Sequence, residues 1–359
     1  MIEPTYPPAP NNRIQWYRTA LPKEVLANLN AKSDLKGFVQ SLGHFGFMVA
    51  TATTTLYAAA HKMWWIMAIA LFLHGTAASF AINAVHELGH KSVFKTQALN
   101  QFFCRLFAFF GLINHEHFFA SHMRHHQYTL HAPDDLEVVL PIKVLTKHFF
   151  QYAIIHTKPW EVVKFHIKHH TRLARGRFEG QWEATIFPAD QPEKALPTIQ
   201  WARFLLIGHG LILALSIALA IAVGPYWLLL PVLTSYPAYG GWLQFLCNNT
   251  QHIGLQDNVN DFRLSCRTFT LNPVAQFFYW HMNYHIEHHM FAAVPCYNLQ
   301  KLHKAIQHEL PPTPHGLYAV WKEIAAIQRK QAEDPEYQHV APLPGKEPVH
   351  PSALGAGAY

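Results

Sequence analysis

Residues 63–90 read MWWIMAIALFLHGTAASFAINAVHELGH, an apolar run over 63–85 that ends directly in two histidines, His86 and His90. About 20 apolar residues cross a bilayer core as one helix, so this run is long enough to span a membrane. Histidines four residues apart lie on one face of a helix and could share one metal ion. The stretch therefore predicts a transmembrane helix with metal ligands at its end.

Three further apolar stretches have a similar length, at 37–60, 202–223 and 226–247. Two residues separate 37–60 from 63–85, and two more join 202–223 to 226–247, so each pair predicts a tight hairpin. The sequence therefore predicts an all-α integral membrane protein with four transmembrane helices arranged in two hairpins.

Nearly all lysines and arginines lie outside these stretches, in 1–36, 86–201 and 248–359. The positive-inside rule places these three segments in the cytoplasm. The chain is 50% hydrophobic and 14% charged, with a net charge of +6, which favours a basic protein at an anionic membrane surface over a nucleic-acid binder. We therefore expect a multi-pass protein of the bacterial inner membrane or endoplasmic reticulum, with a cytosolic helical cap and no nucleic-acid partner.

The chain is predicted to have three parts: a cytosolic N-terminal segment at 1–36, a membrane domain at 37–329 and a disordered tail at 330–359. The first part lacks the apolar core of a cleavable signal, and the tail is rich in proline, alanine and glycine without periodicity. The shorter apolar segments 99–113 and 144–156 are predicted to be interfacial helices.

Two further histidine clusters share the spacing H-x-x-H-H: HMRHH at 122–126 and HIEHH at 285–289. Adjacent residues point about 100° apart on a helix, so each cluster could serve two neighbouring metal ions. Both follow predicted spans on the same membrane side as HELGH, where a helical bundle can bring them together. The three clusters supply eight imidazoles, His86, His90, His122, His125, His126, His285, His288 and His289. Neutral imidazole suits iron, copper, nickel and zinc, which leaves the metal open.

Acidic residues accompany these clusters, and carboxylates commonly orient metal-bound imidazoles by accepting the other ring N–H. We expect such a role here, with solvated surface acids as the alternative, for Glu87, Glu287, Asp134, Asp135 and Glu137. Arg124 is expected to pair with one of these acids or with a substrate headgroup.

A third H-x-x-H-H sequence, HIKHH at 166–170, is interpreted differently. Lysines and arginines flank it, and a positive field opposes the accumulation of a divalent cation. It is predicted to lie on a helix that begins near Pro159 and rests on anionic headgroups.

The stretches HELGH, HMRHHQYTLHAPDDLE and NYHIEHHMFAAVPCYNLQKLH resemble the three histidine boxes of the membrane fatty acid desaturase superfamily, from about residue 40 to 310. The resemblance implies two non-haem iron ions and the O2-dependent introduction of a C=C bond into a fatty acyl or related alkyl chain. On the stretch NNTQH at 248–252 it also implies a ninth ligand, His252, and a role for Asn248 in reaching a metal-bound water.

Two alternatives stay open. NNTQHIGL and HELGHK are also similar to membrane alkane hydroxylases, so hydroxylation or oxidative alkene formation is possible. A metal transporter or sensor would want ionisable ligands within the spans, which hold only His44, His74 and His209.

The sequence has neither the H-P-G-G haem motif of cytochrome b5 nor a ferredoxin-like cysteine cluster. For an oxidative enzyme we therefore expect a separate electron donor, a ferredoxin or a cytochrome b5. Its other expected partners are O2, membrane lipid and the alkyl-chain substrate.

Overall fold

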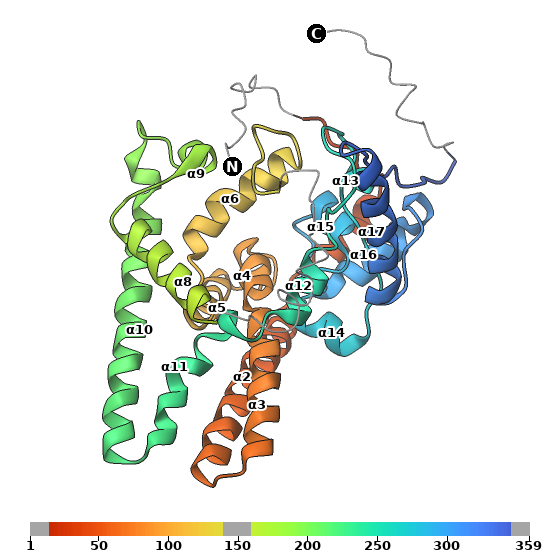
Figure 1. Ribbon diagram of the computed structural model, residues 1–359. Coiled ribbons are helices and arrows are strands. Elements are labelled where there is room, and N and C mark those ends of the chain that lie inside the picture. Colours follow the sequence, from red (N-terminus) through yellow and green to blue (C-terminus); the bar gives the residue numbers. More distant parts are fainter. Residues whose placement is uncertain (1–13, 139–158, 346–359) are drawn as a thin grey trace.

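The computed structural model describes residues 14–138 and 159–345, and its described part is built from helices (Figure 1). No β-strand forms within these ranges, where two isolated bridges join Thr268 to Tyr284 and Thr270 to His315. The α-helices are α1 (Lys23–Leu29), α2 (Asp34–Ala60), α3 (Trp64–Ser79), α4 (Ala81–Gly89), α5 (Gln97–Phe110), α6 (His115–Tyr128), α8 (Pro159–Ala174), α9 (Gly180–Ile186), α10 (Leu196–Ala222), α11 (Leu229–Leu233), α12 (Trp242–Asn248), α13 (Phe262–Ser265), α14 (Pro273–Phe278), α15 (His285–Met290), α16 (Leu299–Ile306) and α17 (Gly316–Glu333).

The first predicted hairpin is formed by α2 and α3. Ser33 caps α2 by accepting a hydrogen bond from the backbone N–H of Lys36, and Asp34 anchors the same end by accepting from the hydroxyl of Thr96 at 2.7 Å. At Phe80 the chain leaves α3 and enters α4, which carries the first histidine box. The predicted stretch 63–85 is therefore helical, with one interruption at Phe80. The first histidine box follows directly at the C-terminal end of this stretch.

The second predicted hairpin differs from expectation in its second arm. The stretch 202–223 lies within α10, but 226–247 is not one helix. It is divided into a 3-10 turn at Pro225–Leu228, α11, a 3-10 turn at Tyr236–Ala238 and α12. The prolines at 225, 231 and 237 and the glycines at 240 and 241 interrupt backbone hydrogen bonding along this stretch, so the prediction of a single spanning helix here was wrong.

Two helical stretches among the described residues are long and apolar enough to cross a membrane, Trp64–Gly89 and Pro192–Ala222. They contain most of the predicted spans 63–85 and 202–223. Helix α2 has the length but not the hydropathy, because His44 and the threonines at 51, 53, 54 and 55 dilute its apolar residues.

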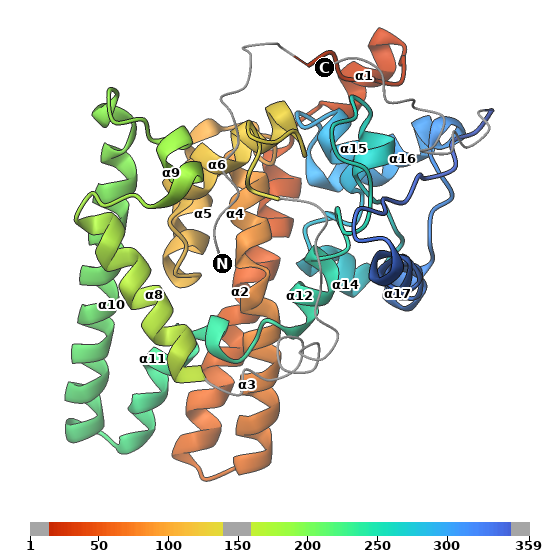
Figure 2. The ribbon, with the colours of Figure 1, turned by 45° about the horizontal axis from the view of Figure 1, so that its top comes forward.

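The two hairpins extend from the remaining helices toward the same end of the molecule (Figure 1). Their outer surfaces carry exposed apolar side chains, such as Trp65 at 84% and Ile221 at 83% exposure. At the opposite end α1, α6, α15 and α16 lie close together, and α1 contacts α16 (Figure 2).

The segments predicted to be interfacial or disordered have mixed outcomes. The stretch 99–113 is mostly α5, whereas 144–156 lies outside the described residues. The boundary at 330 was placed too early, because α17 continues to Glu333 and the backbone N–H of His339 donates to the carbonyl of Gly254 at 2.7 Å. Of the predicted tail, 346–359 lies outside the described residues.

One apolar core joins the helices that carry histidines. Leu88 of HELGH and both Ile286 and Met290 around HIEHH are buried in the same cluster as Phe107 of α5. The apolar residues between the histidines pack into this core, and the histidine rings of the different helices lie beside one another.

Candidate metal centre

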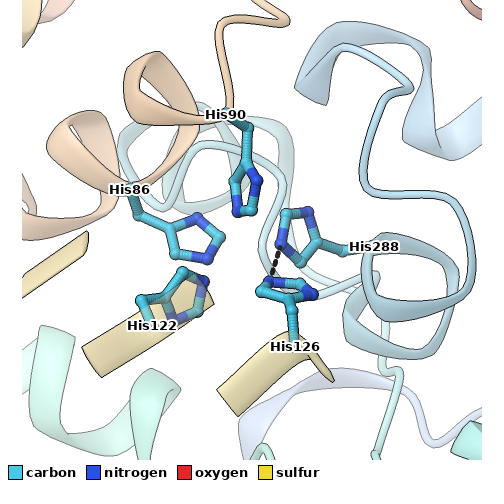
Figure 3. Close-up of side chains that lie close together, drawn as sticks. All are labelled: His86, His90, His122, His126 and His288. Carbon is cyan, nitrogen blue, oxygen red and sulfur yellow. Dashed lines mark hydrogen bonds between the residues drawn. The ribbon is translucent and has the colours of Figure 1, made fainter. Parts of the chain in front are cut away.

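The three boxes lie on three different helices whose histidines lie close together. His86 belongs to α4 and His90 ends it, HMRHH lies on α6, and HIEHH forms most of α15. Figure 3 shows imidazoles from all three elements pointing toward one another. The structure therefore brings together side chains that are up to 203 residues apart in the sequence, as the boxes predicted.

The histidines form two groups, in each of which one ring nitrogen per residue lies within 4.8 Å of the others. The five-histidine group consists of His86, His90, His122, His126 and His288. The four-histidine group consists of His125, His252, His285 and His289, all of them buried. All nine residues expected from the sequence are present, and His126 and His289 bring the groups into contact, with ring centroids 4.3 Å apart.

The ring nitrogens that point into each group are placed as metal ligands would be. In the five-histidine group, the Nε2 atoms of His86, His90 and His122 are buried and have no hydrogen-bond partner among the described residues. In the four-histidine group, Nε2 of His285 lies 3.0 Å from Nε2 of His252 and 3.1 Å from Nε2 of His289. Buried ring nitrogens that converge in this way, with no partner or only another imidazole nitrogen, fit metal ions.

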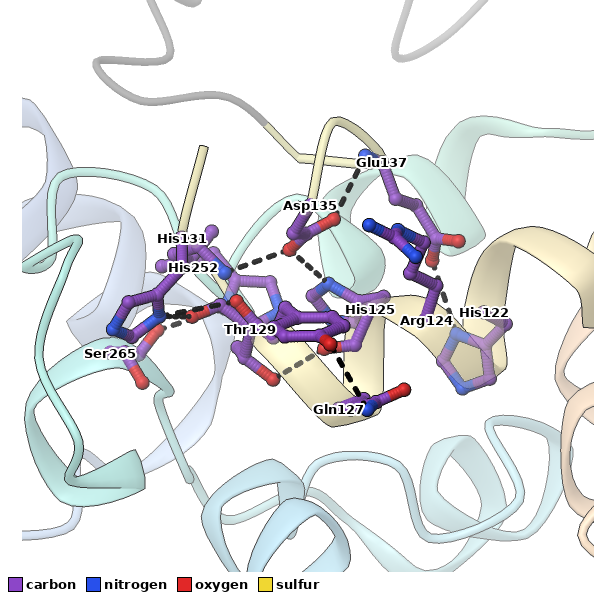
Figure 4. A network of polar contacts seen from close by, with 12 residues as sticks. His122, Arg124, His125, Gln127, Thr129, His131, Asp135, Glu137, His252 and Ser265 are labelled. Carbon is purple, nitrogen blue, oxygen red and sulfur yellow. Dashed lines mark hydrogen bonds and ion pairs between the residues drawn. The ribbon is translucent and has the colours of Figure 1, made fainter. Parts of the chain in front are cut away.

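The opposite ring nitrogens contact carboxylates, as expected for oriented ligands. Nδ1 of His125 lies 2.7 Å from Asp135, and Nδ1 of His122 lies 3.1 Å from Glu137 (Figure 4). One Glu87 oxygen lies 3.1 Å from Nδ1 of His86 and 3.3 Å from Nδ1 of His288, although only the first contact has hydrogen-bond geometry. These contacts confirm the expectation for three of the five acids.

The other two acids have different partners, which corrects the prediction for them. Asp134 pairs with Arg124, as anticipated for that arginine, and it forms no hydrogen bond with an imidazole of either group among the described residues. Glu287 contacts Nδ1 of His303 and accepts a hydrogen bond from Thr268 at 2.5 Å. Spacing alone did not reveal this, because His303 comes from α16.

Two orienting contacts were missed by sequence reasoning because they involve uncharged groups. Nδ1 of His252 lies 2.8 Å from the carbonyl oxygen of Ser265, and Nδ1 of His289 lies 3.2 Å from the hydroxyl of Thr129. A backbone carbonyl carries no sequence signal. Thr129 follows the second box by three residues and could have been suspected only from that proximity.

Burial keeps most of these imidazoles neutral, which is the form that binds metal. It lowers the pKa of His90 to about 4 and, helped by the charge of His125, that of His252 to about 3. His125 is the exception: burial acts to lower its pKa, but the adjacent Asp135 carboxylate outweighs burial and raises it.

HIKHH stands apart from both groups, as predicted. It lies on α8, which begins at Pro159. Nε2 of His170 lies 3.0 Å from the carbonyl oxygen of Leu112, and His169 lies beside Arg172. Neither candidate metal group among the described residues includes a histidine of this helix.

Other histidines near the boxes in sequence also lie outside the two groups. His117 contacts Glu183, His131 packs edge-on against Trp16, and Nδ1 of His281 lies 3.1 Å from the side-chain nitrogen of Gln276. Asn248 ends α12, four residues before His252, and its side chain makes no hydrogen bond with another described residue. Its expected role toward a metal-bound water stays a prediction.

An all-helical fold with nine converging imidazoles defines a class of protein with a candidate two-metal centre. The model of the fatty acid desaturase family matches residues 62–321, a range that contains all nine histidines. Because this match spans well over half of the sequence, the chain belongs to the fatty acid desaturase family. A search of curated proteins found no match. Membership implies a membrane-associated oxidoreductase that acts on lipid or acyl chains with O2.

Proposed function

We propose that this protein is a diiron desaturase that uses O2 to introduce a C=C bond into a fatty acyl or related alkyl chain. The observation that carries the proposal is the pair of adjacent imidazole groups, whose converging nitrogens lie inside the range matched by the family. Two iron ions held there would supply the redox chemistry with O2 that removal of hydrogen from an unactivated CH2 requires.

The proposed ligands are the nine histidines of the two groups, His86, His90, His122, His126 and His288 for one iron and His125, His252, His285 and His289 for the other. Glu87, Glu137 and Asp135 would fix the orientation of the rings that they contact. Asn248 is proposed to face the second iron through a water molecule. The apolar core around these groups would exclude bulk water during the reaction.

We also propose that the domain at 37–329 crosses the membrane with both hairpins, so that the metal centre lies at the cytosolic rim. The common direction of the hairpins and the exposed apolar side chains of α3 and α10 support this arrangement (Figure 1). The interrupted stretch 226–247 can cross beside α10 and α2, since η3, the 3-10 turn at Pro225–Leu228, contacts both helices.

Hydroxylation and oxidative alkene formation share the first hydrogen abstraction with desaturation, so their products separate them. The full-length protein would be expressed in a host without the activity, and cellular lipids would be profiled by mass spectrometry after growth under 18O2. A new C=C bond without label is the expected result. Retained label in the product would instead identify a hydroxylase.

A matched control is the variant His285→Ala, which removes one imidazole from the four-histidine group without adding charge. We expect no new lipid product from it. Metal transport by purified protein in vesicles, without any lipid product from the unmodified chain, would contradict the proposal and favour the transporter alternative.

A further inference from the structure

The N-terminal segment 14–21 crosses the cap beside the four-histidine group, and it is held there by specific contacts. The indole N–H of Trp16 donates to the carbonyl oxygen of Gln127 at 3.0 Å, and the backbone N–H of Tyr17 donates to the carbonyl oxygen of Asn260 at 2.8 Å. The hydroxyl of Thr19 donates to Glu309 at 2.6 Å. These contacts tie the segment to α6, to the loop before α13 and to the 3-10 turn Gln307–Glu309 that follows α16.

Contacts between aromatic rings connect this segment with a candidate metal ligand, His289. The indole of Trp16 is half-buried and stacks on Phe262, with ring centroids 4.2 Å apart and planes at 13°. Phe262 is buried, and its ring centroid lies 5.3 Å from that of His289. Two ring contacts therefore connect a partly accessible tryptophan with the four-histidine group.

We propose that Trp16 is the point at which a one-electron carrier protein docks and passes electrons through Phe262 to the four-histidine group. This inference rests on the proposed function. Desaturation consumes O2, two electrons and two protons for each two hydrogens removed from the chain, and releases two water molecules, so two reduced carriers are each oxidised once. The sequence has neither a cytochrome b5 haem motif nor a ferredoxin-like cysteine cluster, so these electrons come from a separate carrier.

The surface beside Trp16 suits an acidic carrier. Arg18 is exposed and forms no ion pair with another described residue within 4.0 Å. Tryptophan and arginine are enriched among residues that dominate protein interfaces, and an unpaired positive charge steers an acidic partner. Buried Arg263, by contrast, is already paired with Asp261 and lies under the ring of Tyr17.

Docking can be tested on metal-free protein, because binding of the carrier needs no iron. The four native cysteines at 104, 247, 266 and 296 are all buried, so a new surface cysteine can be labelled specifically. A new cysteine in R18C would carry a photo-cross-linker on metal-free protein, with R175C, on an exposed arginine after α8, as the matched control. A cytochrome b5 haem domain and a [2Fe–2S] ferredoxin would be tested separately. At least one carrier should cross-link at position 18 in preference to 175. Equal or weaker cross-linking at position 18 for both carriers would overturn the proposal.

Electron transfer is tested with iron-loaded Trp16→Leu and Phe262→Leu, which keep an apolar side chain but remove the ring. Carrier oxidation followed by stopped-flow absorbance should slow in both variants, and Trp16→Leu should also weaken carrier binding by roughly tenfold. Reduction by dithionite, which needs no docking, should be unchanged. If the unmodified protein yields no product with dithionite, the proposed function fails. If it does yield product, but both variants accept electrons from the carrier as fast as the unmodified protein, only the electron-entry proposal fails.

Discussion

The two histidine groups of the cap differ in how they are assembled. The five-histidine group draws on all three boxes, and one carboxylate, Glu87, lies between two of its rings. The four-histidine group has no member from HELGH, includes His252 from outside the boxes, and uses a carboxylate, a hydroxyl and a backbone carbonyl as ring partners. The first group therefore has one more imidazole than the second, so we expect it to tolerate the loss of one ligand better.

Each H-x-x-H-H box is divided between the groups in the same way. Its first and last histidines stay together, and the middle one joins the other group: His125 leaves His122 and His126, and His288 leaves His285 and His289. Residues four apart share a helical face, whereas the adjacent position points about 100° away. The spacing thus makes each box a bridge between the two candidate metal positions.

The largest expected effect is the loss of an imidazole from the smaller group. His252→Ala leaves three imidazoles there, and we expect metal binding by that group to weaken by more than roughly 100-fold, beyond the loss typical for changed outer partners. His90→Ala leaves four in the larger group and should cost only about tenfold. Metal content of purified protein after a chelator challenge measures both. Equal losses in the two variants would contradict the difference in redundancy.

A smaller effect is expected from the ring-orienting acids. Asp135→Asn replaces a carboxylate that uses both oxygens: one contacts Nδ1 of His125 at 2.7 Å and accepts from the backbone N–H of Leu130, and the other accepts from the backbone N–H of Glu137. A carboxamide has only one oxygen, so at least one of these contacts must be lost. We expect a roughly 10–100-fold loss of metal affinity in the four-histidine group. Glu87→Gln keeps one acceptor oxygen for His86 and should lie near the lower end of that range, in the other group.

Chelator titrations of both acid variants, with helix content by circular dichroism as a control for folding, check this prediction. If Asp135→Asn released metal from the five-histidine group and spared the other, the assignment of carboxylates to groups would be wrong.

The smallest effect is expected in HIKHH, which has the same spacing as the boxes HMRHH and HIEHH of the two candidate metal groups. His169→Ala removes an imidazole that contacts Arg172 and belongs to neither group. Metal content should therefore stay at the level of the unmodified protein. A measurable loss of bound metal would show that HIKHH binds metal although it lies outside both groups.

Much of the local structure was predictable because it depends on neighbouring residues. The apolar run before HELGH specified α3 and α4, and Pro159 marked the start of α8. The stretch 226–247 was mispredicted because its apolar composition was weighed above its prolines and glycines. Likewise, the partner of Glu287 was missed, and the acid that pairs with Arg124 was left open, since the contacts of His303 and Arg124 with these acids are not encoded by spacing.

The sequence by itself determined which side chains can bind metal and that each box presents them in two directions, because helical geometry fixes both. Only the tertiary structure decided which nitrogens share a group, that His252 completes the smaller one, and that the N-terminal segment lies against it. Those outcomes depend on how α4, α6 and α15 pack into one apolar core. Packing is a property of residues far apart in the chain, which no local pattern contains.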